Sequence, residues 1–254
     1  MSDEVLVERR GHVQVITLNR PGQRNALNLD VAVAVAAAVD ELDESEDLRV
    51  GILTGAGGTF SSGMDLKAFL RGESPALEGR GLCGITETPP RKPLIGAVEG
   101  YAVAGGFELL LACDLVVAGR TARLGVPEVK RALVAAGGAA MMLPRRIPYA
   151  LALELLLTGD PVDAERAAAM GLVNQVVDEG QALDAALVLA ERIAVNGPLA
   201  VAATKAVARA SADWTLEQGW KEQGVLLGSV FTSEDAREGA TAFAEKRPPV
   251  WKGR

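Results

Sequence analysis

Histidine, cysteine and aromatic residues are all scarce in this chain. Its 254 residues include one histidine, His12, two cysteines, Cys83 and Cys113, and only 4% aromatic residues. A single histidine nearly excludes histidine-based catalytic triads and multi-histidine zinc sites. Two cysteines outside any Cys-x-x-Cys spacing provide neither a disulfide framework nor a thiolate metal site, so we expect no metal. Acid–base chemistry would therefore fall to carboxylates or lysines.

Long apolar runs and net positive charge are missing as well. The chain has no run of about 18 apolar residues, the length that crosses a membrane. Its first residues, Met1-Ser2-Asp3-Glu4, lack the positive and apolar regions of a signal peptide, so we expect a cytoplasmic protein. The formal net charge of −7 disfavours nucleic acid or anionic membrane surfaces as partners. With 49% hydrophobic and 23% charged residues, the composition is that of a soluble globular protein.

The order of the expected elements indicates an α/β fold. Residues 5–18 alternate apolar and polar side chains, which is typical of a β-hairpin or two consecutive strands. Two buried-strand candidates, 49–54 and 93–98, each lead through a glycine turn into a short helix, and this rhythm favours a mainly parallel core. Residues 71–90 are expected to form a mobile surface loop. Helices are expected at 28–42, 65–70, 105–112, 139–146, 149–157, 163–170, 181–196, 198–212, 216–231 and 234–246.

Two glycine turns carry the first chemical signal. One runs from Thr59 to Leu66 and the other from Gly100 to Leu109. Glycines let backbone N–H groups approach a ligand, and a helix N-terminus adds a positive partial charge. The two turns could aim two N–H groups at one oxygen and form an oxyanion hole. Two ordinary strand-to-helix connections are an equally open interpretation.

Two glutamates accompany these turns. Glu108 falls in the first turn of the expected helix at 105–112, and Glu128 follows Pro127 in a loop. Each has an ordinary explanation, because acidic residues are favoured at helix starts and loop glutamates are usually solvated. Two carboxylates together are the minimum for moving a proton on and off neighbouring carbons.

Five ordered segments together resemble the crotonase (enoyl-CoA hydratase/isomerase) family. They are Arg24 to Asn28, Phe60 to Leu66, Gly100 to Leu109, Val126 to Glu128 followed by Gly137-Gly138, and Phe243 to Arg247. The resemblance covers essentially the whole chain. It implies a ClpP-like spiral of repeated β-β-α units over residues 1–197, and a C-terminal helical trimerisation region over residues 198–254. The assembly would be a homotrimer or a hexamer built as a dimer of trimers.

The resemblance also implies a lyase of lipid metabolism that reversibly adds water, in the syn sense, to a trans-2-enoyl-CoA. The substrate would be an acyl-CoA thioester, with no separate cofactor because coenzyme A is part of it. The backbone N–H groups of Met64 and Gly105 would form the oxyanion hole. Glu108 would activate water and Glu128 would supply or remove the Cα proton, and either could start protonated. The coenzyme A contacts would be Arg24, Ala26, Leu27, Ser62, Asp65 and Leu66, with Phe243 and Lys246 from a neighbouring subunit.

Several alternatives and departures accompany this resemblance. Phe107-Glu108-Leu109 and the chain from Ser233 to Arg254 are similar to the carnitinyl-CoA dehydratase (crotonobetainyl-CoA hydratase) branch. A Δ3-Δ2-enoyl-CoA isomerase, a non-catalytic acyl-CoA binder and an RNA-binding member remain as other candidates. Ala104 replaces a frequent glycine of the second turn, and Ala136 and Ala139 replace glycines of the loop that would help to seat water.

Overall fold

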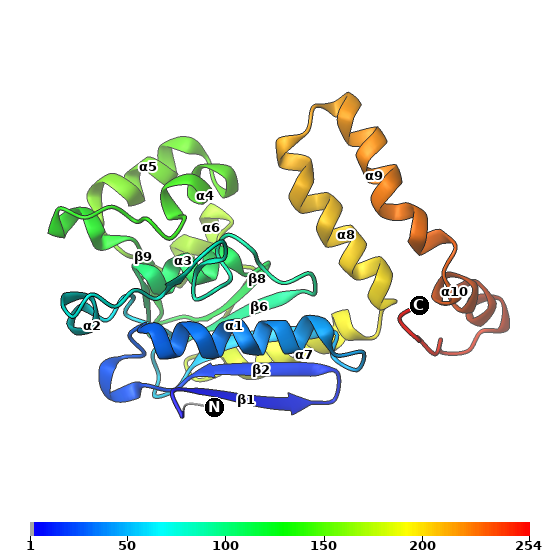
Figure 1. Ribbon diagram of the computed structural model, residues 1–254, viewed down its shortest axis with the longest axis horizontal. Coiled ribbons are helices and arrows are strands. Elements are labelled where there is room, and N and C mark those ends of the chain that lie inside the picture. Colours follow the sequence, from blue (N-terminus) through cyan, green and yellow to red (C-terminus); the bar gives the residue numbers. More distant parts are fainter. Residues whose placement is uncertain (1–2) are drawn as a thin grey trace.

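A six-stranded sheet forms the centre of the structure, a computed structural model that describes residues 3–254 (Figure 1). The expectation of a cytoplasmic protein rested partly on the first four residues, and two of these, Met1 and Ser2, lie outside the described residues. The strands follow the order β1 (Val5–Arg10), β2 (Val13–Leu18), β3 (Val50–Gly55), β6 (Leu94–Val98), β8 (Leu115–Gly119) and β11 (Gln175–Val177). β1 and β2 form the expected antiparallel hairpin, and every later pair of neighbours is parallel.

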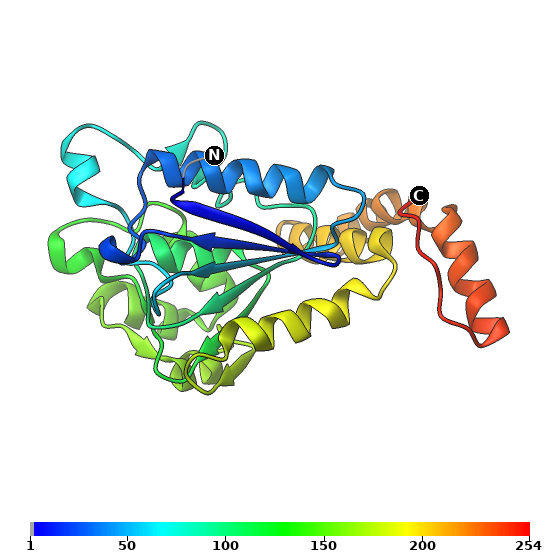
Figure 2. The same ribbon diagram turned by 90° about the horizontal axis from the view of Figure 1, so that it is seen from below.

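Two helices cover the two faces of this sheet. Figure 2 shows α1 (Leu29–Glu44) above the sheet and α7 (Ala182–Ala194) below it. The strands between them are buried on both faces, so β6 is apolar along its whole length. On α7, the small side chains of Ala186, Ala190 and Ala194 pack against the sheet in a second core cluster. The expected α/β class with a mainly parallel core is confirmed.

Short strands that the sequence did not predict hold the two glycine turns together. β7 (Tyr101–Val103), β9 (Arg123–Gly125) and β10 (Val162–Asp163) form a second sheet. The first glycine turn runs along β7, because Ser61 N–H donates to Tyr101 O at 2.8 Å and Val103 N–H donates to Ser61 O at 3.1 Å. Strands of two or three residues are too short to show a periodic pattern.

The loop expected at 71–90 contains structure of its own. β4 (Ala76–Leu77) and β5 (Gly81–Leu82) pair as a small antiparallel ladder, and Gly81 to Ile85 are buried. A surface loop along this whole stretch was therefore a wrong prediction. Leu82, Cys83 and Ile85 pack into the main core and anchor this segment to it.

The expected helices are present with small shifts at their ends. Side-chain caps explain several starts: Asn28 caps α1, Asp65 caps α2 and Ser233 caps α10. The remaining helices are α2 (Leu66–Leu70), α3 (Gly105–Ala112), α4 (Ala139–Arg146), α5 (Tyr149–Thr158), α6 (Ala164–Met170), α8 (Pro198–Ala210), α9 (Leu216–Phe231) and α10 (Glu234–Glu245), with 3-10 turns η1 (Pro21–Gln23), η2 (Pro127–Arg131) and η3 (Ser211–Asp213).

Helices α8, α9 and α10 extend from the sheet as an arm (Figure 1). Within the described chain, neither α8 nor α9 contains a buried residue. Lys205 fastens α8 to the core, since its Nζ donates to Asp114 Oδ2 at 2.6 Å and to Lys92 O at 2.9 Å. The division into a core and an oligomerisation region at 197/198 stays a prediction. No single helix between residues 3 and 254 is long and apolar enough to cross a membrane, and α7 with α8–η3 reaches that length only as a pair bent by 107°.

Candidate active site

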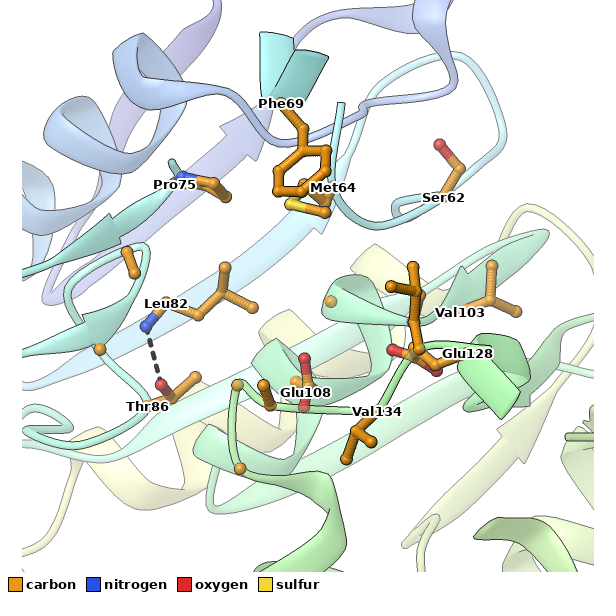
Figure 3. A pocket seen from close by; sticks show the side chains of 18 of the residues that line it. Ser62, Met64, Phe69, Pro75, Leu82, Thr86, Val103, Glu108, Glu128 and Val134 are labelled. Atoms are coloured by element: carbon orange, nitrogen blue, oxygen red, sulfur yellow. Dashed lines mark hydrogen bonds between the residues drawn. The ribbon is translucent and has the colours of Figure 1, made fainter. Parts of the chain in front are cut away.

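A cavity of about 830 Å³ opens where the two glycine turns, η2 and the loop before α4 meet. Figure 3 shows its walls, with Glu108 and Glu128 side by side and Met64 across the opening. The wall is mainly apolar. It also carries a small set of charged side chains: Arg24, Glu87, Glu108, Glu128 and Arg131.

Met64 and Gly105, the residues predicted to supply the two backbone N–H donors, both line this cavity. Leu27 pairs with Met64 as an isolated parallel bridge: its N–H donates to Gly63 O and its carbonyl accepts from Asp65 N–H, both at 2.8 Å. This pattern leaves the Met64 N–H without an acceptor within residues 3–254. Gly105 is the first residue of α3, where an N–H has no partner inside the helix.

Gly63 sets the spacing between these two N–H groups. A Cβ at this position would lie 2.9 Å from Gly105 N and 2.7 Å from Ala104 Cβ, so the two turns touch here. Gly63 also has a φ of 87°, which favours glycine. The two expected turns therefore meet at Gly63. That their N–H groups bind one oxygen atom stays a prediction.

Ala104 bends the chain sharply into α3. It has a φ of 52° and a ψ of −129°, a conformation that glycine adopts readily and alanine does not. Such a residue costs of order 1–3 kcal/mol and is retained where the surrounding structure enforces it. The Ala104 N–H donates to Gly125 O at 2.9 Å, which holds the bend immediately before Gly105, a residue that lines the cavity. That alanine in place of glycine leaves the Gly105 donor intact stays a prediction.

Glu108 is buried at the floor of the cavity rather than exposed at the start of a helix. It is 5% exposed, and its Oε1 accepts a hydrogen bond from Ala139 N–H at 3.1 Å. The pKa of its carboxyl is raised to about 6, mainly by burial and also by the nearby Glu128 charge, while hydrogen bonds from the N–H groups of Ala139, Gly137 and Gly138 oppose this rise. A carboxyl with this pKa can both hold and release a proton near neutral pH.

Glu128 faces Glu108 from η2 and is half-buried. Its Oε2 is buried and accepts no hydrogen bond from residues 3–254. Burial raises the pKa of this carboxyl, and the positive charge of Arg131 opposes the shift. The ordinary explanation for a loop glutamate, full solvation, does not apply here.

The residues predicted to bind coenzyme A fall into three groups. Arg24, Ser62 and Leu66 line the cavity, and Ser62 N–H donates to Arg24 O at 3.0 Å. Ala26 and Leu27 are buried beneath the wall and support it. The other three do not line the cavity: they are Asp65, Phe243 and Lys246.

Asp65 performs a structural task in this chain. Its carboxylate accepts from Lys67 N–H and Ala68 N–H as the cap of α2 and pairs with Arg20 at 3.0 Å. Phe243, on α10, is 87% exposed, and Lys246 follows at the end of that helix. In the folded molecule, α10 and α2 lie at opposite ends (Figure 1).

Several cavity residues were not predicted from the sequence. They are Phe69, Leu82, Tyr101, Arg131, Val134, Met141 and Met142. They come from separate short elements and one loop, and only the folded chain places them around one cavity. Arg131 could have been found from its spacing, because it lies three residues after Glu128 and would share a face with it in a 3-10 turn.

The arrangement combines two backbone donors, two carboxylates and an apolar wall. It can polarise a carbonyl oxygen and move a proton at an adjacent carbon. Among residues 3–254, no group of three histidine, cysteine or acidic side chains could hold a metal ion. The expectation that the protein needs no separate cofactor stays a prediction.

Comparisons with known proteins agree with this arrangement. The family model described as enoyl-CoA hydratase/isomerase matches residues 8–254. The crystal structure of enoyl-CoA hydratase EchA1 from Mycobacterium marinum is 59% identical, with a TM-score of 0.97 and complete coverage of both chains. Enoyl-CoA hydratase EchA19 from Mycobacterium tuberculosis is 44% identical over 99% of this chain and 97% of its own, and carnitinyl-CoA dehydratase from Salmonella enteritidis is 42% identical over both whole chains. The chain therefore belongs to the enoyl-CoA hydratase/isomerase family, and its fold is the crotonase fold.

Proposed function

We propose that this protein is an enoyl-CoA hydratase, a hydro-lyase that reversibly adds water to the Cα–Cβ double bond of a trans-2-enoyl-CoA. The observation that carries the proposal is the pairing of Glu108 and Glu128 in one cavity beside the N–H groups of Met64 and Gly105. The enoyl-CoA hydratases among its relatives support the same activity.

The two backbone N–H groups stabilise the negative charge that develops on the thioester oxygen. Met64 N–H and Gly105 N–H donate to this oxygen as the enolate forms. Because both belong to the main chain, they are held in place before the substrate arrives. One such donor contributes about 3–4 kcal/mol to transition-state stabilisation in enzymes of this kind.

The two carboxylates exchange a proton with the substrate. In hydration, Glu108 removes a proton from water as the water oxygen bonds to Cβ, and Glu128 gives its proton to Cα. The C=C bond becomes a single bond, and the pair keeps one proton overall. In dehydration each step reverses: Glu128 removes the Cα proton, and Glu108 protonates the departing hydroxyl group.

Coenzyme A enters along the wall formed by Arg24, Ser62 and Leu66, on the side of the first glycine turn. Phe243 and Lys246 contact it from a neighbouring subunit, since α10 lies at the opposite end of the molecule from α2, whose first residue Leu66 belongs to this wall. The uncovered surfaces of α8 and α9 support a homotrimer, or a hexamer of two trimers. A cytoplasmic location and the lack of a metal or redox cofactor belong to the same proposal.

Carnitinyl-CoA dehydratase is the second candidate activity. Its support is the 42% identity to the Salmonella protein over both whole chains. The solved structure that is 59% identical is named an enoyl-CoA hydratase, which favours the first candidate. Both activities would use the same two glutamates.

The test is hydration of crotonyl-CoA and longer enoyl-CoAs, followed as loss of the conjugated thioester absorbance. We expect turnover by the native chain, and a fall in kcat of about 10²–10⁴-fold in both Glu108→Gln and Glu128→Gln. Turnover of a 3-enoyl-CoA that survives Glu108→Gln would indicate an isomerase instead. Turnover of carnitinyl-CoA alone would select the second candidate, and no turnover of any thioester would refute both.

A further inference from the structure

Arg131 brings a positive charge to the cavity that the proposed reaction does not use. It is the last residue of η2 and lines the cavity wall. It forms no ion pair within the described part of the chain, whereas its neighbour Lys130 pairs with Asp160. Arg131 is exposed in the open cavity, so its charge is available to groups there.

The geometry of η2 directs Arg131 towards Glu128. Side chains three residues apart in a 3-10 helix lie on the same face, one above the other, and these two residues have that spacing. The buried Oε2 of Glu128 accepts no hydrogen bond from residues 3–254. Burial raises the pKa of Glu128, and two groups oppose this rise: the backbone N–H of Glu128 itself and the guanidinium charge of Arg131. Arg131 is the cation that acts on this carboxylate.

The other charged groups around the cavity differ in their position. Glu108 faces Glu128 from α3, Arg24 follows η1, and Glu87 lies in the segment before β6. Tyr101 on β7 is the remaining titratable side chain of the wall. Burial raises the pKa of both carboxyls, but the charge that acts on each differs: the Glu128 charge adds to the rise at Glu108, whereas the Arg131 charge opposes the rise at Glu128.

We propose that Arg131 is a positioning residue that keeps Glu128 ionised, so that the one proton shared by the carboxylate pair resides on Glu108. The inference rests on the proposed function. In this state the site is ready for dehydration of a 3-hydroxyacyl-CoA. Glu128 takes the Cα proton, the C–O bond at Cβ breaks, and Glu108 gives its proton to the leaving hydroxyl, which departs as water. The pair regains its resting state when the proton returns to Glu108.

The pH profile of kcat/KM for crotonyl-CoA tests this role. Removal of the charge in Arg131→Gln raises the pKa of Glu128, so we expect the acidic limb to move up by about 0.5–1 pH unit. Arg131→Lys keeps the charge and should restore the native limb. Added salt should shrink the difference between the native protein and Arg131→Gln, because an exposed cation is screened. Lys130→Gln, which removes the same charge on the outer side of η2, is the matched control and should leave the limb unchanged.

Two results would overturn the inference. One is an acidic limb that stays in place in Arg131→Gln, and the other is a rise in KM alone, which would assign Arg131 to coenzyme A binding. A second measurement is independent of turnover: ¹³C NMR titration of the Glu128 carboxyl in the substrate-free protein, expected to move to higher pH in Arg131→Gln. If the native chain hydrates no enoyl-CoA, the proposed function fails, whereas the NMR titration still decides whether Arg131 controls Glu128.

Discussion

Glu108 illustrates how the surroundings of one side chain change its chemistry. In the sequence it is an acid at a helix start, a place where acids are common. In the structure it points into the cavity and contacts the turn before α4, with Ala139 N–H as its donor. Burial among these groups, rather than the helix, raises its pKa to about 6. Its position in the sequence alone could not distinguish the two roles.

Gly137 keeps space for the Glu108 carboxylate. A Cβ at this position would lie 2.5 Å from Glu108 Oε2, which is closer than real contacts allow. We expect Gly137→Ala to displace the carboxylate and lower kcat by about 10²-fold, the typical effect of a 1 Å misplacement. The measurement is the crotonyl-CoA assay, and Gly22→Ala, with no atom within 4 Å of the added Cβ, is the control. Native kcat in Gly137→Ala would contradict this account.

Glu108 should also make stability depend on pH. Its pKa of about 6 in the folded chain exceeds the ordinary value of 4.5, so the folded state holds this proton more tightly. The stabilisation is complete below pH 4.5 and is lost as the pH rises through 6. The glutamine in Glu108→Gln does not titrate. Between pH 4 and pH 7 the native protein should therefore lose about 2 kcal/mol of unfolding free energy relative to the variant.

Denaturant unfolding at these two pH values measures that difference. Glu154→Gln, which removes a charge from an exposed position on α5, is the control. Parallel pH curves for the native protein and Glu108→Gln would show that burial does not shift this carboxyl. Together with the expected loss of turnover, a more stable variant would show that the catalytic acid is retained at a cost in stability.

Among the secondary-structure elements, helices could be predicted and short strands could not. Local signals mark the helices, such as the Asn28 cap of α1 and the Ser233 cap of α10. β7 and β9 have three residues each, and they exist because they pair with each other. These strands nevertheless join the first glycine turn to the second, so the parts that the sequence did not predict are the ones that assemble the site.

A partly buried ion pair joins helix α8 to the core. Lys205 and Asp114 have side chains that are 11% and 24% exposed, and Asp114 also accepts from Leu94 N–H at the start of β6. We expect Lys205→Met to lower the free energy of unfolding by about 1–3 kcal/mol, because Asp114 and Lys92 O lose a donor. Amide exchange in α8 should accelerate while that in α7 stays slow.

Lys221→Met, at an exposed position on α9, provides the comparison for this change. It removes the same charge without breaking an ion pair of the described chain. Equal exchange rates for α8 in the native protein and Lys205→Met would indicate that other contacts hold the arm.

At the scale of the whole molecule, the arm of α8, α9 and α10 leaves large apolar side chains uncovered. Leu216, Trp220, Val225 and Phe231 on α9 are each at least 70% exposed. A set of large apolar side chains of this kind marks an interaction surface. We expect light scattering to give three or six times the chain mass, and Trp220→Glu to shift the protein towards the monomer.

Dissociation of Trp220→Glu into monomers should also reduce turnover if Phe243 and Lys246 reach the cavity of a neighbouring subunit. Glu217→Gln, elsewhere on α9, is the control for the effect of charge. A native protein that is monomeric at micromolar concentration would refute the proposed assembly.

The sequence by itself determined the family, the α/β class, the helices and the two glutamates, because these depend on local caps, periodicity and ordered motifs. Tertiary structure alone decided that Met64 and Gly105 line one cavity, that Glu108 is buried and that Glu128 and Arg131 line the same cavity. Distance and dielectric surroundings control these properties, and both arise only when segments far apart in the chain pack together.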